Sequence, residues 1–290
     1  MPNYVIHDLF SQFLNFWNGV KSKTIDEQID LWNQEYLKKD HDLLLKMKTN
    51  YEEEGYDWRK IAREKIFPFI SERLTLMKKS YNSIKTSIVP VYRKAEKILG
   101  LDFDVNFIIY VGIGNGAGWA TTYRGKRACL FGLENMAELG WVDSDILKGL
   151  IAHELGHLIH FEWRERNSLL IESPLSFWQL YEEGFAQRCE HLIMEDNTWH
   201  QERASKKWLE WCKTNRKFLV LKFMETITNN QPCNEFFGSW FDIKGYNFTG
   251  YYLGHEMIQE WQENYSIKEI ALFPLSTIKK KVTETLKKWM

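Results

Sequence analysis

His153, Glu154 and His157 form an H-E-x-x-H motif, the pattern in this chain with the clearest chemical meaning. Asp143 is a plausible N-cap and the apolar residues over 146–151 recur at helical spacing, so we expect the motif inside a helix. There the two histidines lie about 40° apart in azimuth and about 6 Å apart along the axis, close enough to bind one zinc ion. Glu154 projects to one side, where it can act on a water without being a ligand. The neighbouring residues are apolar, which disfavours the alternative of two solvated surface histidines.

A third ligand must come from another segment. The metzincin pattern, with a histidine six positions after His157, is excluded because Trp163 stands there. Further along the chain, the stretch Y-E-E-G-F-A carries Glu182 and Glu183 within an expected helix. Adjacent helical residues differ by about 100° in azimuth, so these two carboxylates cannot share one face.

H-E-x-x-H followed on a later helix by E-G-F-A resembles the gluzincin zinc peptidases. The similarity is to aminopeptidase-N-like enzymes, to the thermolysin-like catalytic core and to some uncharacterised zinc proteases, and it covers approximately residues 105–265. The resemblance implies that Glu183 is the third zinc ligand and that each chain holds one zinc ion. The interval from His157 to Glu183 is longer than in the aminopeptidases, so we expect the loop over 167–173 to be enlarged.

Two further polar residues follow the same helical stripes. Glu190 lies two turns after Glu183, and two interpretations stay open: it accepts the free N–H of a zinc-bound histidine, or it is an ordinary surface carboxylate. His160 follows His153 by two turns, about 10 Å along the axis, which is too far for the same coordination sphere. We therefore interpret His160 as a core or cleft histidine.

Peptide hydrolysis also needs a hydrogen-bond donor for the oxyanion. The segment G-Y-Y-L-G-H over 250–255 contains the candidates. Resemblance to the aminopeptidases implies that Tyr251 supplies a catalytic phenol, whereas resemblance to thermolysin implies that His255 does so. The two residues are four apart and can face a cleft from one helix. The alternative is a buried aromatic cluster without a catalytic role.

Glu134 is the candidate for substrate binding. The sequence Gly132-Leu133-Glu134-Asn135 is similar to the G-x-M-E-N of aminopeptidases, whose glutamate holds the free amine of the substrate. That resemblance implies an amine-binding role for Glu134, with Leu133 replacing the methionine. A simple strand end is the other interpretation.

The elements that must position these residues change character along the chain. Residues 1–100 have helical spacing almost throughout, beginning with Ile6 and Leu9, and we expect Pro90 and Gly100 to start and end the last helix. The glycine-rich stretch over 112–118 lacks a P-loop lysine and leads into a strand, which predicts a flexible turn. Strands are predicted, from β-branched and aromatic runs, at 105–111, 119–124 and 127–131.

From residue 143 onward the pattern is helical again. We expect an α+β, mostly helical protein with a small mixed sheet and a thermolysin-like core. An N-terminal helical region over 1–100 precedes a gluzincin-like catalytic domain over 101–290, and the two can pack as one unit.

The composition excludes several classes of protein. Of 290 residues, 44% are apolar and 27% charged, as in globular proteins, and no apolar run approaches the length of a membrane span. The start of the chain has no basic n-region, so no secretory signal is expected. A formal charge of −1 argues against nucleic-acid binding. Four cysteines without a C-x-x-C indicate reduced, buried thiols, and we expect a cytoplasmic protein.

The function predicted from these observations is zinc-dependent hydrolysis of a peptide or small protein. Glu154 acts as general base, and Tyr251 or His255 stabilises the oxyanion. One alternative is a zinc hydrolase that acts on a non-peptide amide or an epoxide. The other is a non-catalytic scaffold that retains zinc, which the three-ligand set and Glu154 disfavour.

Overall fold

The computed structural model describes residues 3–38, 40–53, 55–169, 173–202 and 207–290, which form two compact units. The N-terminal unit comprises residues 1–96 and 100–151, and the C-terminal unit comprises residues 97–99 and 152–290. The division falls within the helix that carries H-E-x-x-H, whereas we expected a boundary near residue 100 from the change in sequence character.

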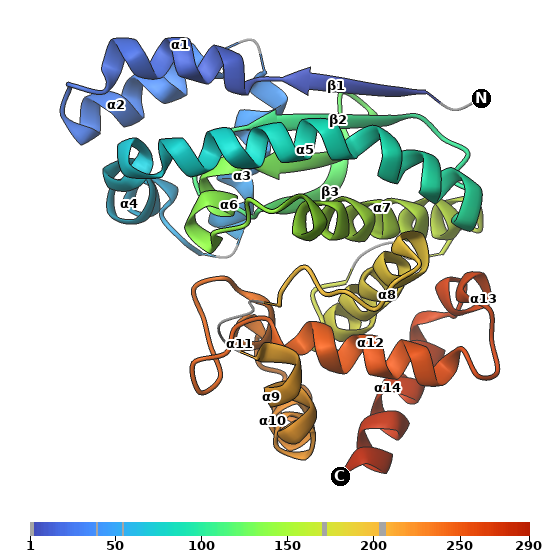
Figure 1. Cartoon of the computed structure of the whole chain (residues 1–290). Helices are drawn as coiled ribbons and strands as arrows, with labels where there is room; N and C mark the ends of the chain where they lie inside the picture. Colours follow the sequence, from blue (N-terminus) through green and yellow to red (C-terminus); the bar gives the residue numbers. More distant parts are fainter. Residues whose placement is uncertain (1–2, 39, 54, 170–172, 203–206) are drawn as a thin grey trace. The chain divides into compact units, whose positions relative to one another are not determined.

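The described residues are mostly helical, with one small sheet (Figure 1). The strands are β1 (Tyr4–Asp8), β2 (Val105–Tyr110), β3 (Gly118–Tyr123) and β4 (Lys126–Gly132). The helices before β2 are α1 (Phe10–Val20), α2 (Ile25–Leu31), α3 (His41–Glu53), α4 (Trp58–Ile61) and α5 (Ile70–Leu99), with π-helical turns at Trp32–Tyr36 and Ala62–Ile66 and a 3-10 turn at Phe67–Phe69. The later helices are α6 (Leu133–Leu139), α7 (Ser144–Arg166), α8 (Ser176–Met194), α9 (Trp208–Thr214), α10 (Arg216–Thr228), α11 (Asn234–Phe237), α12 (Thr249–Trp261), α13 (Ile267–Ala271) and α14 (Leu275–Trp289).

A mixed four-stranded sheet forms the centre of the N-terminal unit. Its strand order is β1-β2-β4-β3; β1 and β4 run parallel to β2, and β3 runs antiparallel to β4. Every residue of β2 is buried, as expected for an apolar strand with neighbours on both sides. The β3–β4 turn has Arg124 and Gly125 at positive φ, the conformation that a tight hairpin requires. The predicted strands of the middle segment, and with them the mostly helical α+β class, are confirmed.

The expectation of helix throughout residues 1–100 is wrong at the start of the chain. Residues 4–8 form the edge strand β1, with Tyr4 opposite Val105 and Ile6 opposite Phe107. Helical spacing begins only at Phe10, where α1 starts. Local periodicity did not identify the strand because its partner lies about a hundred residues away in sequence, and the pairing supplies the stabilisation.

Pro90 lies inside a helix and does not begin one. The helix α5 runs without a break from Ile70 to Leu99 and contains Pro90. Proline removes one backbone hydrogen bond there, and the length and packing of the helix tolerate that loss. Gly100 ends the helix with φ 68°, a left-handed conformation that glycine adopts without strain, so the predicted C-cap is confirmed.

Glycines set the crossings of the helices in the C-terminal unit. Helix α8 packs against α12, and a Cβ added to Gly254 of α12 would lie 2.5 Å from the Leu180 carbonyl oxygen and 2.7 Å from the Gly184 Cα of α8. A Cβ on Gly156 of α7 would lie 2.7 Å from the Cys189 Cβ of α8. Only glycine lets the backbones approach this closely, so α8 is held directly against both α7 and α12.

The described residues from α7 to α14 are mostly helical, as predicted from residue 143 onward. Part of the loop expected to be enlarged, residues 170–172, lies outside the described residues. All four cysteines are buried: Cys129 in the N-terminal unit, and Cys189, Cys212 and Cys233 in the C-terminal unit. Among the helices described, none combines the length and apolar character needed to cross a bilayer.

Candidate metal centre

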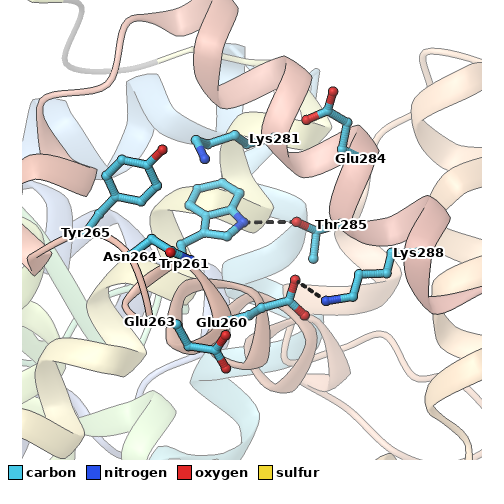
Figure 2. A pocket seen from close by; sticks show the side chains of 9 residues that line it. All are labelled: Glu260, Trp261, Glu263, Asn264, Tyr265, Lys281, Glu284, Thr285 and Lys288. Carbon is cyan, nitrogen blue, oxygen red and sulfur yellow. Dashed lines mark hydrogen bonds and ion pairs between the residues drawn. The ribbon is translucent and has the colours of Figure 1, made fainter.

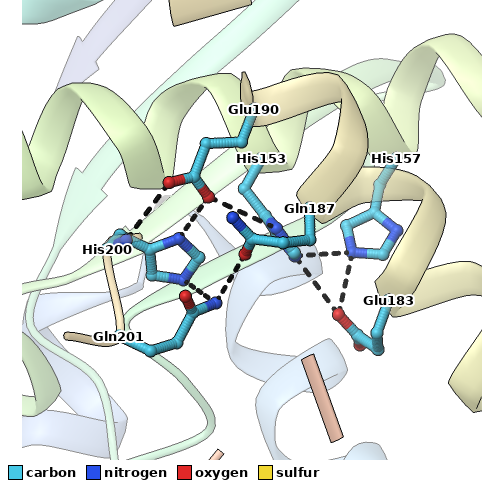
Figure 3. Close-up of polar contacts among 7 residues, drawn as sticks. All are labelled: His153, His157, Glu183, Gln187, Glu190, His200 and Gln201. Carbon is cyan, nitrogen blue, oxygen red and sulfur yellow. Dashed lines mark hydrogen bonds and ion pairs between the residues drawn. The ribbon is translucent and has the colours of Figure 1, made fainter. Parts of the chain in front are cut away.

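Three ligand-type atoms from two helices converge in the C-terminal unit (Figure 3). His153 Nε2 lies 3.1 Å from His157 Nε2 and 3.2 Å from Glu183 Oε2, and His157 Nε2 lies 3.3 Å from the same carboxylate oxygen. The histidines come from α7 and the glutamate from α8, and the Gly156 contact brings these helices together.

The spacing of these atoms fits a zinc ion. Ligands about 2.0–2.1 Å from a tetrahedral zinc ion are separated by about 3.3 Å, close to the three distances observed. Two nitrogens and one carboxylate oxygen are ligands that zinc accepts, and such a set leaves one position open for water or substrate.

The electrostatics favour a positive charge at this point. Burial lowers the pKa of His153 to about 4, against the opposing effect of its contact with Glu183. Burial would also lower the pKa of His157, but the Glu183 and Glu154 carboxylates outweigh it and raise the pKa to about 9. For Glu183 the raising effect of burial is overcome by His157 and His153, which hold its pKa well below the usual range. A metal ion bound here would replace the proton on His157.

Glu154 lies beside this group without belonging to it. Its side chain is buried, and its negative charge raises the pKa of both His157 and Tyr251. Glu182, in contrast, accepts a hydrogen bond from Trp178 Nε1 at 3.0 Å. The two carboxylates therefore differ: Glu154 acts on both His157 and Tyr251, whereas Glu182 acts on His157 and is hydrogen-bonded to Trp178.

Tyr251 reaches the ligands from α12. Its ring centroid lies 5.5 Å from that of His153, and its hydroxyl forms a hydrogen bond with Glu183. Burial, followed by the charges of Glu183 and Glu154, raises its pKa well above 10, so the phenol stays protonated as a donor. The structure thus brings Tyr251 to the site from a segment that begins 67 residues after Glu183 in sequence.

His255 lies one turn further along α12 and faces other residues. Its ring packs against His191, with centroids 4.2 Å apart, and against Trp199 at 4.8 Å. Its Nδ1 lies 3.3 Å from Glu256 Oε1. Tyr251, and not His255, is therefore the residue of this pair whose ring contacts a ligand.

Glu190 is fully buried, which excludes its interpretation as an ordinary surface carboxylate. Its Oε2 lies 3.9 Å from His153 Nδ1 and accepts a hydrogen bond from His200 Nδ1 at 2.6 Å. His200 was not identified from the sequence. It lies in the irregular segment after α8, where no periodicity links it to the motif residues. The only signal in the sequence was the presence of one more histidine shortly after that helix. Burial raises the pKa of Glu190, but His200 and then His153 outweigh it, and the net pKa is lowered.

His160 is a core residue, as the sequence predicted. Its Nε2 lies 2.9 Å from the Tyr181 hydroxyl, which in turn donates to the Ile270 carbonyl at 3.1 Å. Its ring packs against Phe185 with centroids 4.8 Å apart. His160 thus links α7 to α8, Tyr181 links α8 to α13, and His160 is not among the converging ligands.

Glu134 belongs to the N-terminal unit, in the first turn of α6 directly after β4. Its carboxylate accepts hydrogen bonds from the backbone N–H groups of Gly112 at 2.8 Å and Gly114 at 3.1 Å. Burial raises its pKa to about 7, although these backbone donors oppose that effect. Within this unit Glu134 holds the glycine-rich segment in place, and its predicted role with a substrate amine stays a prediction.

The C-terminal unit also has a surface pocket between the end of α12 and α14 (Figure 2). It is lined by charged and aromatic side chains, among them Trp261, Tyr265, Lys281 and Glu284. Trp261 Nε1 donates to Thr285 Oγ1 at 2.9 Å. Trp261 is ten residues after Tyr251 on the same helix, about 15 Å along the axis, so this pocket is separate from the converging ligands.

The chain matches no family model, no curated protein and no solved structure.

Proposed function

We propose that the protein is a zinc-dependent peptidase whose metal ligands are His153, His157 and Glu183. The observation that carries the proposal is the convergence of these three ligand atoms within 3.1–3.3 Å of one another, with the buried Glu154 beside them. A structural zinc site normally has four protein ligands, whereas this one has three and an adjacent carboxylate that such a site does not need.

Zinc bound by these residues would supply a Lewis acid that lowers the pKa of a water molecule towards about 7 and polarises the scissile carbonyl. Glu154 accepts the proton of the attacking water and later delivers it to the leaving amine. The Tyr251 phenol, protonated at neutral pH, donates a hydrogen bond to the carbonyl oxygen as negative charge develops there. The Glu190 carboxylate, whose Oε2 lies 3.9 Å from His153 Nδ1, would orient the ring that binds the metal.

The replacement of Glu154 by Gln tests this function. The amide has nearly the same volume but cannot accept the proton, so we expect hydrolysis to fall by at least about 10²-fold while zinc content stays near one per chain. The measurement is cleavage of a mixed peptide pool, with free and blocked N-termini, followed by mass spectrometry, together with metal analysis of each protein.

A matched control is Glu165→Gln, the same substitution at the exposed end of α7, which should leave activity unchanged. Undiminished peptide cleavage by the Glu154 variant would contradict the mechanism. If the wild-type protein binds zinc but cleaves only non-peptide amides or epoxides, the hydrolytic chemistry stands and the substrate class is wrong.

A further inference from the structure

His153 presents its second ring nitrogen to a different group of side chains. Its Nε2 faces His157 and Glu183, so a metal bound there leaves the proton of the neutral ring on Nδ1. That nitrogen is fully buried and has no hydrogen-bond partner, while Glu190 Oε2 lies 3.9 Å away. A buried N–H without an acceptor is unfavourable, so the orientation of the His153 ring depends on where the Glu190 carboxylate lies.

His200 controls that placement. Its backbone N–H donates to Glu190 Oε1 at 3.1 Å, and its Nδ1 donates to Glu190 Oε2 at 2.6 Å, so one residue holds both carboxylate oxygens. The Gln201 side-chain amide donates to His200 Nε2 at 2.9 Å and to Gln187 Oε1 at 2.8 Å. All of these side chains are buried, and Figure 3 shows Glu190, His200 and Gln201 on the side of His153 opposite to His157 and Glu183.

We propose that His200 is a positioning residue of the metal centre, which acts through Glu190 to orient the imidazole of His153. This inference rests on the metal site of the proposed function and is independent of the peptidase chemistry. It ties the irregular segment after α8 to metal affinity, although none of the described residues of that segment is among the three proposed ligands. Partners of this kind change metal affinity by about 10–100-fold when they are removed.

A second ion held by His153, Glu190 and His200 is the competing explanation, because these three also have ligand-type atoms close together. The 2.6 Å between His200 Nδ1 and Glu190 Oε2 is the distance of a short N–H···O hydrogen bond to a carboxylate. Two atoms that bind one zinc ion at about 2.0–2.1 Å are separated by about 3 Å or more. The geometry therefore favours a hydrogen-bonded clamp over a second metal site.

The test compares His200→Phe with His200→Asn in the full-length protein. Phenylalanine keeps the bulk of the ring and removes both nitrogens, whereas the asparagine amide restores a donor close to the position of Nδ1. Zinc affinity is measured by competition with a chromophoric chelator, and ligand geometry by the visible absorption of the cobalt(II) form. The matched control is His191→Phe, which changes a buried histidine next to Glu190 that packs on Trp199 of the same segment.

We expect His200→Phe to weaken zinc binding by about 10–100-fold and to alter the cobalt spectrum. His200→Asn should recover most of the affinity, and His191→Phe should keep wild-type affinity and spectrum. Because His200 acts through Glu190, adding His200→Phe to Glu190→Gln should cause little further loss.

Wild-type zinc affinity in His200→Phe, or fully additive losses in the double variant, would overturn the inference. So would two zinc ions per wild-type chain with one lost in His200→Phe, since His200 would then be a ligand. A wild-type protein that binds zinc but hydrolyses nothing would refute only the proposed function, and one that binds no zinc would refute both.

Discussion

Glu182 and Glu183 are adjacent carboxylates that helix α8 directs to different partners. Glu183 contacts both histidines of the motif, whereas Glu182 accepts a hydrogen bond from Trp178. We expect Glu183→Ala to lose zinc and Glu182→Ala to keep it. The loss of zinc affinity in Glu183→Ala should exceed the about 10–100-fold that follows removal of a residue that only orients a ligand. Metal analysis after dialysis against a weak chelator measures both. The reverse order of loss would make Glu182 the ligand.

The Tyr251 hydroxyl is the group best placed to stabilise an oxyanion. Tyr251→Phe removes only that hydroxyl, so we expect kcat to fall by about 10²–10³-fold with little change in KM or zinc content. Steady-state kinetics on one good peptide measures the effect. The control is Tyr252→Phe, the same change at a buried neighbour on α12, and His255→Ala should have the smaller effect of the two candidate donors.

Small and equal effects at Tyr251 and His255 would show that the oxyanion donor lies elsewhere. A large effect confined to His255 would transfer the role to that residue, and would require α12 to present a face other than the one that contacts His153.

At the residue scale, helical geometry correctly predicted which side chains are neighbours on one helix. It could not predict the contacts of a residue in an irregular segment, such as His200. The spacing of His153 and His157 on α7 is a property of any helix, so their proximity could be predicted. Glu190 could be placed on the stripe of Glu183, but its burial depends on packing. His200 lies in an irregular segment, and its contact with Glu190 arises only from the tertiary fold.

At the scale of elements, glycines decide whether the ligands can meet. The sequence motifs singled out Gly184 and Gly254 only as parts of E-G-F-A and G-Y-Y-L-G-H. In the structure these glycines lie against each other where α8 crosses α12, one residue from Glu183 and three from Tyr251. Their role could not be predicted because it depends on which helices cross and where.

Gly254→Ala tests that crossing. Its methyl group would meet the Leu180 carbonyl oxygen and Gly184 Cα at 2.5 and 2.7 Å, so the helices must separate. We expect the free energy of unfolding to fall by about 1–3 kcal/mol and zinc affinity to weaken. Denaturant unfolding and chelator competition measure the two effects.

Gly19→Ala is the matched control for that substitution. It makes the same change within helix α1, where no atom lies within 4 Å of the added methyl group, and the higher helix propensity of alanine should stabilise the protein by about 0.5–1 kcal/mol. An equal gain at Gly254 would show that α8 and α12 can part without strain.

At the scale of the whole molecule, composition and patterning predicted the mostly helical α+β class correctly. Apolar and charged fractions typical of globular proteins, one short β-rich segment and long helical stretches were sufficient for that conclusion. Two parts, 1–100 and 101–290, were predicted, but the position of the observed division was not, because it falls within the continuous helix α7, where the sequence has no linker composition. Contacts between distant segments define such a boundary.

The distribution of buried thiols provides a reporter of how this molecule opens. One thiol, Cys129, lies in the N-terminal unit and three lie in the C-terminal unit together with all the proposed ligands. Burial raises the pKa of Cys233 to about 11 and that of Cys189 and Cys212 further, so a thiol reagent reacts only when the surrounding structure opens. Zinc at about a hundred times its dissociation constant should lower the population of the open state, and with it the labelling rate of the three C-terminal thiols, by about 100-fold. Cys129 should react at an unchanged rate if the units open separately, and in step with the others if they open as one, as labelling followed by mass spectrometry can resolve.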